Sequence, residues 1–323
     1  MIGLSGVKID FVEATTTIEA LSKVDATTMV KGSSGKITYP NISTDKIGEY
    51  TIEFVVTNDN GYAKTFKHNI KVVDTTLPVI NLQTMTVVCD TLPNLKEVLK
   101  GESQDNYDGL VETKFEGQVK DKPGIYQVRY YAKDSSNNTA EAIVYYFYQL
   151  TPDTMEEPFA IDGIIVVNKK IPLPKEYGTS RDDSASIMMS NMLQEAKKQG
   201  FDLMENSVFR DYYSQEALYE EKAKTSSKKD LDSTTARPGY SEHQTGLAFD
   251  IIDRDGTNPS NKAYKWLAEN CAGYGFILRY PNGKEDSTGY EYEPWHFRYV
   301  GAISAKEIME NDLTLEQYLK LEN

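Results

Sequence analysis

The stretch "KIGEYTIEFVVTNDNGYAKTF" (Lys46–Phe66) alternates apolar and polar residues and then enters a polar turn, "NDNG". A period of two is typical of a β-strand with one buried face. Tyr50, Ile52, Phe54 and Val56 share one face of this predicted strand. After the turn, "KHNIKVV" (Lys67–Val73) alternates in the same way, so the two runs predict an antiparallel hairpin. We expect His68, in the second run, to lie at the surface or on an edge strand.

The pattern recurs 76 residues further along the chain, as "KPGIYQVRYYAKDSSNNTAEA" (Lys122–Ala142). Modules of this length with many short strands are typical of β-sandwiches. The repeated motif resembles bacterial immunoglobulin-like repeats, and "VDTTLPVI" (Val73–Ile80) resembles the junction between two of them. This resemblance implies a fold and not a function. We expect two all-β immunoglobulin-like sandwiches, at residues 1–74 and 75–150, which act as spacers or bind a cell-wall or protein partner.

The chain beyond residue 150 has a different texture. Apolar residues from Asp183 to Gly200 follow the spacing of one helix face, and these two residues are candidates to cap the helix. Ser304 and Glu307 have the spacing of a capping box at the start of another helix. Helices are also expected at 214–224 and 261–271, and short strands at 163–168, 202–209, 246–252 and 296–300. Residues 151–323 are therefore predicted to form an α+β domain with a small antiparallel sheet, in which 224–235 is a solvated loop that could close over a cleft.

Composition excludes several classes of protein. The formal charge of −14 and the pI of about 4.8 disfavour nucleic acid as a partner, because an acidic surface repels phosphates. Cys89 and Cys271 lie in different predicted domains, so we expect neither a disulfide nor a cysteine-based metal site. No apolar run is long enough to cross a bilayer, and "MIGLSGVKIDF" at the start of the chain does not have the pattern of a signal peptide.

Two of the three histidines lie beside carboxylates, in "SEHQTGLAFD" and "EPWHFRYV". His243, Asp250 and His296 offer two nitrogens and one oxygen, which is a suitable donor set for a catalytic zinc with one open position. Glu293, three residues before His296, is placed to act as a general base. The alternative is that both histidines are structural, with their hydrogen bonds satisfied inside the domain.

Two longer blocks, "ARPGYSEHQTGLAFDI" (Ala236–Ile251) and "GYGFILRYPNGKEDSTGYEYEPWHFRYVG" (Gly273–Gly301), closely resemble the VanY-type D-alanyl-D-alanine carboxypeptidase family of zinc peptidases. The resemblance covers about residues 160–310. It implies that Glu293 is the general base and that Arg210 holds the oxyanion. It also implies that zinc is bound by His243, Asp250 and His296, and that the C-terminal end of the substrate meets Gln215, Ser241 and Tyr280.

The resemblance implies an extracellular or cell-surface bacterial enzyme, expected to be a monomer, that uses zinc-activated water to remove the terminal D-alanine from peptidoglycan stem peptides. Val208 to Asp211 depart from the family's Gly-Tyr-Arg-Ser, so cleavage of a D-alanyl-D-alanine (DD) or an L,D-bond (LD) stays open. Asp211 either alters substrate fit or caps a helix. The alternative functions are a peptidoglycan endopeptidase with the same zinc site and a non-catalytic wall-binding protein.

Overall fold

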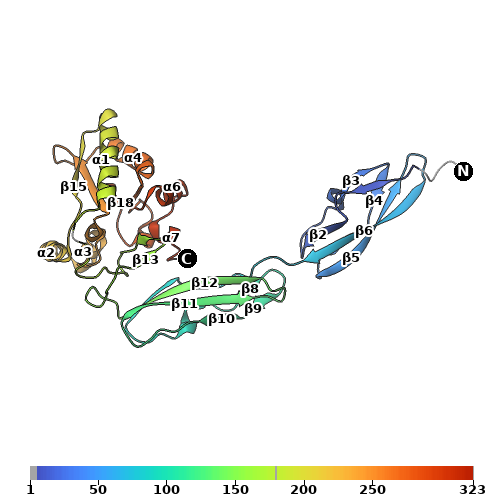
Figure 1. Cartoon of the computed structure of the whole chain (residues 1–323), viewed down its shortest axis with the longest axis horizontal. Helices are drawn as coiled ribbons and strands as arrows, with labels where there is room; N and C mark the ends of the chain where they lie inside the picture. The colour runs from blue at the N-terminus through green and yellow to red at the C-terminus, as the bar shows by residue number, and fades with distance from the viewer. Residues whose placement is uncertain (1–5, 179, 323) are drawn as a thin grey trace. The chain divides into compact units, whose positions relative to one another are not determined.

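The computed structural model describes residues 6–178 and 180–322, and Figure 1 shows their helices and strands. The chain divides into two compact units. The first takes in the described part of Met1–Asn81 together with Leu99–Phe115 and Tyr130–Ala142, and the second consists of Leu82–Val98, Glu116–Arg129 and Ile143–Asn323. The three domain boundaries predicted from the sequence stay a prediction.

The first β-rich segment contains the predicted hairpin as β5 (Gly48–Thr57) and β6 (Ala63–Val73). These strands form a four-stranded sheet in the order β2-β6-β5-β4, with β2 at Thr15–Glu19 and β4 at Lys36–Thr38. β2 runs parallel to β6, and the other pairs are antiparallel. A separate pair joins β1 (Ile9–Phe11) to β3 (Val30–Ser33), which follows the 3-10 helix η1 (Ala26–Met29). The core of this segment combines residues from the four-stranded sheet and from η1: Ile18, Ala26, Met29, Ile52, Phe54, Ile70 and Val72.

The second β-rich segment repeats this topology. β11 (Gly124–Lys133) and β12 (Thr139–Tyr148) lie in the sheet order β10-β11-β12-β7, with β10 at Thr113–Glu116 and β7 at Thr86–Cys89. β7 is parallel to β12, as β2 is to β6. This segment also contains the 3-10 helix η2 (Leu95–Val98) and a hairpin of two short strands, β8 (Ser103–Asp105) and β9 (Gly109–Val111). The prediction of a β-rich N-terminal half is confirmed, and its immunoglobulin-like identity stays a prediction.

A tyrosine hydrogen bond explains the repeated Gly-x-Tyr motif. The phenol of Tyr50 donates to the carbonyl of Lys46 at 2.9 Å, and that of Tyr126 donates to the carbonyl of Lys122 at 2.6 Å. A Cβ added at Gly48 would lie 3.3 Å from the Tyr50 oxygen. Glycine therefore leaves room for the ring to fold back over the start of the strand.

The expected position of His68 is wrong. β6 is an inner strand, between β2 and β5, and His68 is buried on it. Its ring stacks on Phe11 with 4.2 Å between centroids, and its Nε2 lies 2.8 Å from the hydroxyl oxygen of Thr16. His68 is therefore a structural histidine whose contacts are satisfied by packing and one hydrogen bond.

The second unit contains the α+β region that carries the site. Its sheet is fully antiparallel, in the order β15-β16-β18-β17: Leu203–Ser207, Ala248–Asp253, His296–Tyr299 and Phe276–Leu278. One core lies between this sheet and three helices: α1 (Asp183–Lys198), α4 (Asn261–Asn270) and the 3-10 helix η4 (Cys271–Tyr274). The buried residues of this core include Met189, Met192, Phe249, Leu267, Phe276 and Phe297. Cys271 is buried in this core, and both cysteines are free, as predicted.

A second core in this unit joins the end of β12 to the C-terminal helices α6 (Ala302–Glu310) and α7 (Leu315–Tyr318). Phe147 from β12 and Phe159 pack edge to face at 5.3 Å within it. The short hairpin of β13 (Ala160–Ile161) and β14 (Ile164–Ile165) contributes Ile164 to the same core.

Several local predictions are corrected by the structure. α1 is capped by Asp182 and not by Asp183, although Gly200 does follow its end in a left-handed conformation. α6 begins two residues before Ser304 without a capping box, and a capping box occurs instead at Thr314 in front of α7. Asp211 is the N-cap of α2 (Tyr212–Ala223), which settles its role as a helix cap.

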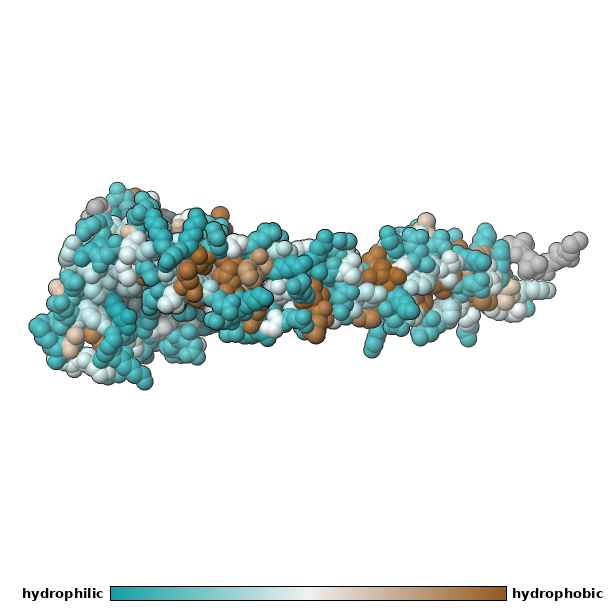
Figure 2. All heavy atoms as spheres, turned by 90° about the horizontal axis from the view of Figure 1, so that it is seen from below, coloured by the Kyte–Doolittle hydropathy of each residue, from teal (hydrophilic) through white to brown (hydrophobic). Residues whose placement is uncertain are grey.

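The segment predicted as a solvated loop contains a helix, α3 (Lys228–Thr234). Ser227 caps its start, and Leu231 is buried beneath it. A four-residue helix, α5 (Glu285–Thr288), completes the elements of this unit. Figure 2 shows a face of the molecule that is largely hydrophilic, with separate hydrophobic patches. Within the described ranges, none of the helices combines the length and the apolar character needed to span a membrane.

Candidate active site

The sheet and one tight turn bring the predicted metal ligands together. Asp250 on β16 and His296 at the start of β18 are paired neighbours in the antiparallel ladder. His243 lies on the 3-10 helix η3 (Glu242–Thr245), which ends at Gly246 with φ +71°. A Cβ at Gly246 would lie 2.4 Å from the carbonyl oxygen of Ser180, so only glycine fits where the chain turns from η3 towards β16.

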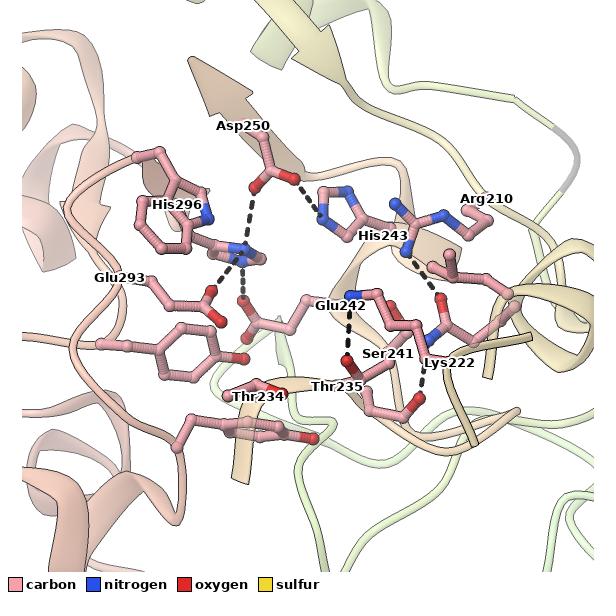
Figure 3. A pocket seen from close by; sticks show the side chains of 16 residues that line it. Arg210, Lys222, Thr234, Thr235, Ser241, Glu242, His243, Asp250, Glu293 and His296 are labelled. Atoms are coloured by element: carbon pink, nitrogen blue, oxygen red, sulfur yellow. Dashed lines mark hydrogen bonds and ion pairs between the residues drawn. The ribbon is translucent and has the colours of Figure 1, made fainter. Parts of the chain in front are cut away.

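The three side chains converge on one point, as Figure 3 shows. His243 Nε2 is 3.3 Å from Asp250 Oδ2, and His296 Nδ1 is 3.2 Å from Asp250 Oδ1. Their donor atoms all lie within 4.8 Å of one another. Asp250 Oδ1 is buried and accepts no hydrogen bond from the part of the chain that the structure describes. A buried carboxylate oxygen of this kind calls for a cation, and two imidazoles with one carboxylate fit zinc.

Hydrogen bonds to the other ring nitrogens orient both histidines. His243 Nδ1 lies 2.8 Å from the carbonyl oxygen of Val208, and His296 Nε2 lies 3.3 Å from Glu242 Oε2. Because both partners are acceptors, we assign the ring protons to these nitrogens. The lone pairs of His243 Nε2 and His296 Nδ1 are then free to face Asp250, which is the tautomer that a metal requires.

Glu242 was not predicted as a site residue, and it links the site to a buried ion-pair network. Its Oε1 accepts hydrogen bonds from Arg279 Nε and Arg298 Nη1, both at 2.8 Å. Arg279 also forms a two-point pair with Glu316, at 2.6 and 2.9 Å. Burial alone would raise the pKa of Glu242, but Arg279 and Arg298 hold it well below its usual range. Glu242 therefore stays ionised and accepts the proton of His296.

Asp250 is likewise held in its ionised form. Its burial works against the charge, but His243 and His296, when their rings are protonated and donate to it, keep the pKa of Asp250 well below its usual range. The carboxylate that a metal needs is thus present over the whole physiological pH range.

Glu293 behaves in the opposite way. Its Oε2 lies 3.6 Å from His296 Nδ1, at the edge of the donor set (Figure 3). Burial raises the pKa of Glu293 to about 7, with His296 acting in the other direction. A carboxyl group that titrates near neutrality can both accept and return a proton, which is the property of a general base and acid.

Arg210 and Gln215 lie together on the other side of the donor set. Arg210 Nη1 donates to Gln215 Oε1 at 2.7 Å, and Nη2 donates to the hydroxyl of Ser207 at 2.8 Å. Gln215 is 1% exposed and donates its own amide hydrogen to the carbonyl of Ala236 at 2.6 Å. Both ends of the Gln215 amide are therefore engaged within the protein, so this side chain positions Arg210.

All eight predicted site residues line a single cleft, with an empty volume of about 610 Å³ including open solvent. Ser241 precedes η3 without using its hydroxyl as a cap, and the ring of Tyr280 lies 4.9 Å from that of His296. Burial raises the pKa of Tyr280 well above its usual value, so its phenol stays protonated. Trp295 also lines the cleft.

The cleft also contains residues that the sequence did not indicate. Lys222, on α2, donates to the hydroxyl of Thr235 at 3.1 Å, and Thr234 at the end of α3 lies on the same wall (Figure 3). Among the described residues that line the cleft, Arg210 and Lys222 are the two that carry the positively charged side chain of an arginine or a lysine. A lysine on a charged surface helix gives no signal in the sequence that would distinguish it from its neighbours.

A His–Asp–His set with an adjacent carboxyl group of raised pKa is the arrangement expected in a metal-dependent hydrolase. Comparison with known proteins agrees with this class. A family model described as VanY, D-alanyl-D-alanine carboxypeptidase, matches residues 180–302. YodJ of Bacillus subtilis (strain 168), which carries the name of a carboxypeptidase, is 38% identical over 194 residues. These residues are 52% of this chain and 70% of that protein. Through its C-terminal half, the chain belongs to the VanY family of peptidases.

Two solved structures are also similar to this half. The LdcB LD-carboxypeptidase is 42% identical over 52% of this chain and 93% of its own, with a TM-score of 0.46. A vancomycin resistance D,D-pentapeptidase VanY from a VanB-type cassette, solved in complex with Zn(II), is 35% identical over 48% and 97%, with a TM-score of 0.45. Membership of the VanY family makes the chain a peptidase. The predicted Zn²⁺ cofactor agrees with this family and with the donor set of His243, Asp250 and His296.

Proposed function

We propose that this chain is a zinc-dependent carboxypeptidase that removes the terminal D-alanine from peptidoglycan stem peptides. The observation that carries the proposal is the arrangement of one cleft, in which His243, Asp250 and His296 face each other between Glu293 and Arg210. Membership of the VanY family supports the reaction. Acting on peptidoglycan requires access to the cell wall, so an extracellular or cell-surface location is part of the proposal.

The chain's own residues divide the chemistry between them. His243, Asp250 and His296 would hold a zinc ion, which would supply Lewis-acid chemistry and acidify the attacking water. Glu293 accepts the proton of the attacking water and returns it to the leaving amine, which its pKa of about 7 permits in both directions. The guanidinium of Arg210, held in place by Gln215 and Ser207, donates hydrogen bonds to the oxyanion of the scissile carbonyl.

The C-terminal carboxylate of the substrate needs hydrogen-bond donors in the cleft. Ser241 and Tyr280 offer hydroxyl groups that line it, as predicted from the sequence. Lys222 adds a cation on the same lining, and its charge also lowers the pKa of Glu293 somewhat. In this proposal Gln215 acts on the substrate through Arg210 and not by direct contact.

Mass spectrometry of stem peptides tests the proposal. The full chain is incubated with tetrapeptide and pentapeptide stems, with and without a chelator, and with zinc added back after chelation. Release of D-alanine that stops with the chelator and returns with zinc is expected. Release from the pentapeptide alone indicates DD-specificity, and release from the tetrapeptide indicates LD-specificity. Internal fragments would identify an endopeptidase, and peptide binding without any product would identify a non-catalytic wall-binding protein.

Replacing Arg210 with lysine tests the role of the guanidinium. Lysine keeps the charge but loses the paired hydrogen bonds, so kcat is expected to fall by about 10²–10³, as for removal of an oxyanion donor. Steady-state kinetics with the preferred stem peptide measures this fall. Arg254→Lys, at an exposed arginine that pairs with Asp202, is the matched control and should leave kcat unchanged. A kcat within threefold of wild type in Arg210→Lys would contradict the assignment.

A further inference from the structure

A second cluster of potential ligands lies in the first unit, far in sequence from the peptidase site. It consists of four aspartates: Asp74, Asp105, Asp108 and Asp134. Asp74 follows β6, Asp105 ends β8, Asp108 lies in the β8–β9 turn, and Asp134 lies in the β11–β12 turn. One carboxylate oxygen from each lies within 4.8 Å of the others.

Two of these carboxylates are buried without a partner for one oxygen. Asp74 is 6% exposed and Asp105 is 7% exposed. The Oδ2 atom of each is enclosed and receives no hydrogen bond from residues 6–178 or 180–322. Asp134 is 7% exposed as well, so three negative side chains share one interior position. Such a group is costly unless a cation neutralises it.

The remaining oxygens of the buried pair hold their own turns in place. Asp105 Oδ1 accepts the backbone N–H groups of Tyr107 and Asp108, both at 2.8 Å. Asp74 Oδ1 accepts the N–H of Thr76 at 3.2 Å. Each carboxylate is therefore fixed by one oxygen and directs the other into the cluster. Burial raises the pKa of Asp74, and the charges of Asp105 and Asp134 add to this effect, while hydrogen bonds from Thr76 and Ser136 oppose it.

The acidic set is not a general feature of the repeated hairpin. The turn after β5 begins with Asn58, where the turn after β11 begins with Asp134, 76 residues later. Both residues hold their turns through side-chain oxygens, Asn58 towards the N–H of Tyr62 and Asp134 towards the N–H of Asn138. An amide oxygen is a sufficient acceptor for the backbone N–H of this turn, as Asn58 shows. The second oxygen of Asp134 also accepts a hydrogen bond from the side-chain amide of Asn138 at 2.8 Å, and its charge adds to that of the other aspartates.

We propose that Asp74, Asp105, Asp108 and Asp134 bind a calcium ion. The donors are all oxygens, which suit a hard cation, and the absence of a nitrogen or sulfur donor in this group disfavours zinc. Calcium accepts irregular carboxylate geometry more readily than magnesium does. The ion would connect the segment after β6 to the β8–β9 turn and to the β11–β12 turn, and so stabilise the first unit.

Calcium titration of the zinc-loaded full chain tests the proposal, by isothermal calorimetry and by thermal unfolding of the β-rich unit. We expect saturable binding with a Kd of about 10⁻³ M or tighter, the range of extracellular calcium modules. At about 100 times the Kd, the melting temperature of this unit should rise by on the order of 10 °C. Absence of both signals at millimolar calcium would overturn the proposal, and so would an equal response to magnesium.

Two variants separate loss of the ligand from loss of the fold. Asp105→Asn and Asp74→Asn should each weaken calcium binding by at least about tenfold, as charge and an oxygen ligand are lost. Without calcium, both variants should melt at or above the wild-type temperature because repulsion in the cluster is reduced. Asp59→Asn, at an exposed aspartate of the β5–β6 turn, is the matched control and should keep the wild-type response. Undiminished calcium binding in Asp105→Asn and Asp74→Asn would refute the site.

Discussion

Replacing Glu293 with glutamine is expected to lower kcat by about 10²–10⁴ while the zinc content of the protein stays at the wild-type level. The loss follows because glutamine keeps the size of the side chain but cannot accept or return a proton. The three predicted ligands are untouched, and Glu293 Oε2 lies 3.6 Å from His296 Nδ1, beside the donor set. Stopped assays with the preferred stem peptide, together with elemental analysis, measure both quantities.

The stability of the same variant provides an independent readout. Burial raises the pKa of Glu293, which means that the folded protein disfavours its ionised form. A neutral glutamine removes this penalty, so Glu293→Gln should melt at or above the wild-type temperature at pH values above 7. Catalysis and stability should then change in opposite directions, as is common for active-site residues.

Glu291→Gln is the matched control for Glu293→Gln. Glu291 lies two residues away, is exposed, and accepts a hydrogen bond from the hydroxyl of Ser233 at 2.7 Å. Its replacement should leave kcat and zinc content unchanged. If Glu293→Gln retained more than a tenth of wild-type kcat, the general base would have to be sought elsewhere in the cleft.

The metal donors could be predicted from the sequence because their chemistry is rare in this chain. Only three histidines occur, and two of them have a carboxylate nearby in sequence, so residue type and short spacing suggested the metal site. The resemblance to the VanY family then favoured it over two structural histidines. Strands were also predicted at 246–252 and 296–300, where β16 and β18 lie, and the pairing of these two strands brings Asp250 next to His296. The hairpins of the β-rich half were predicted for the same reason, since a period of two is a local property.

Other features depend on contacts between distant segments and gave no local signal. α3 has a single buried apolar residue, Leu231, and its sequence is otherwise that of a polar loop. β17 is only three residues long, below the length at which alternation can be recognised. His68 is buried because the ring of Phe11 stacks on it and the hydroxyl of Thr16 lies 2.8 Å from its Nε2. In each case tertiary packing decides the structure, and the local pattern alone favours the wrong prediction.

Glu242 was missed for a related reason: its role depends on two arginines that come 37 and 56 residues later. A carboxylate beside His243 resembles any surface acid until Arg279 and Arg298 are known to be buried. The available signal was the position of these arginines within apolar runs, "GFILRY" and "HFRYV". A buried arginine requires a buried acceptor, which predicts a partner carboxylate without identifying it.

Replacing Glu242 with glutamine should therefore have two effects at once. Stability should fall by about 3–5 kcal/mol because a buried positive charge on Arg298 loses its acidic partner. Zinc affinity should fall by about 10–100-fold because His296 loses the carboxylate that fixes its tautomer and raises its basicity. Urea unfolding measures the first effect, and competition with a chelator of known affinity measures the second.

Glu316→Gln separates these two effects. Glu316 pairs with Arg279 in the same buried network, at 2.6 and 2.9 Å, but makes no hydrogen bond to either histidine of the site. Its replacement should also destabilise the fold by several kcal/mol, on the order expected for a broken buried pair, yet leave the zinc affinity near wild type. If both variants lost zinc equally, general loosening of the network would explain the loss, and a direct effect through His296 would be excluded. Loss of zinc in Glu242→Gln alone would show that one carboxylate serves the fold through its Oε1 and the metal site through its Oε2.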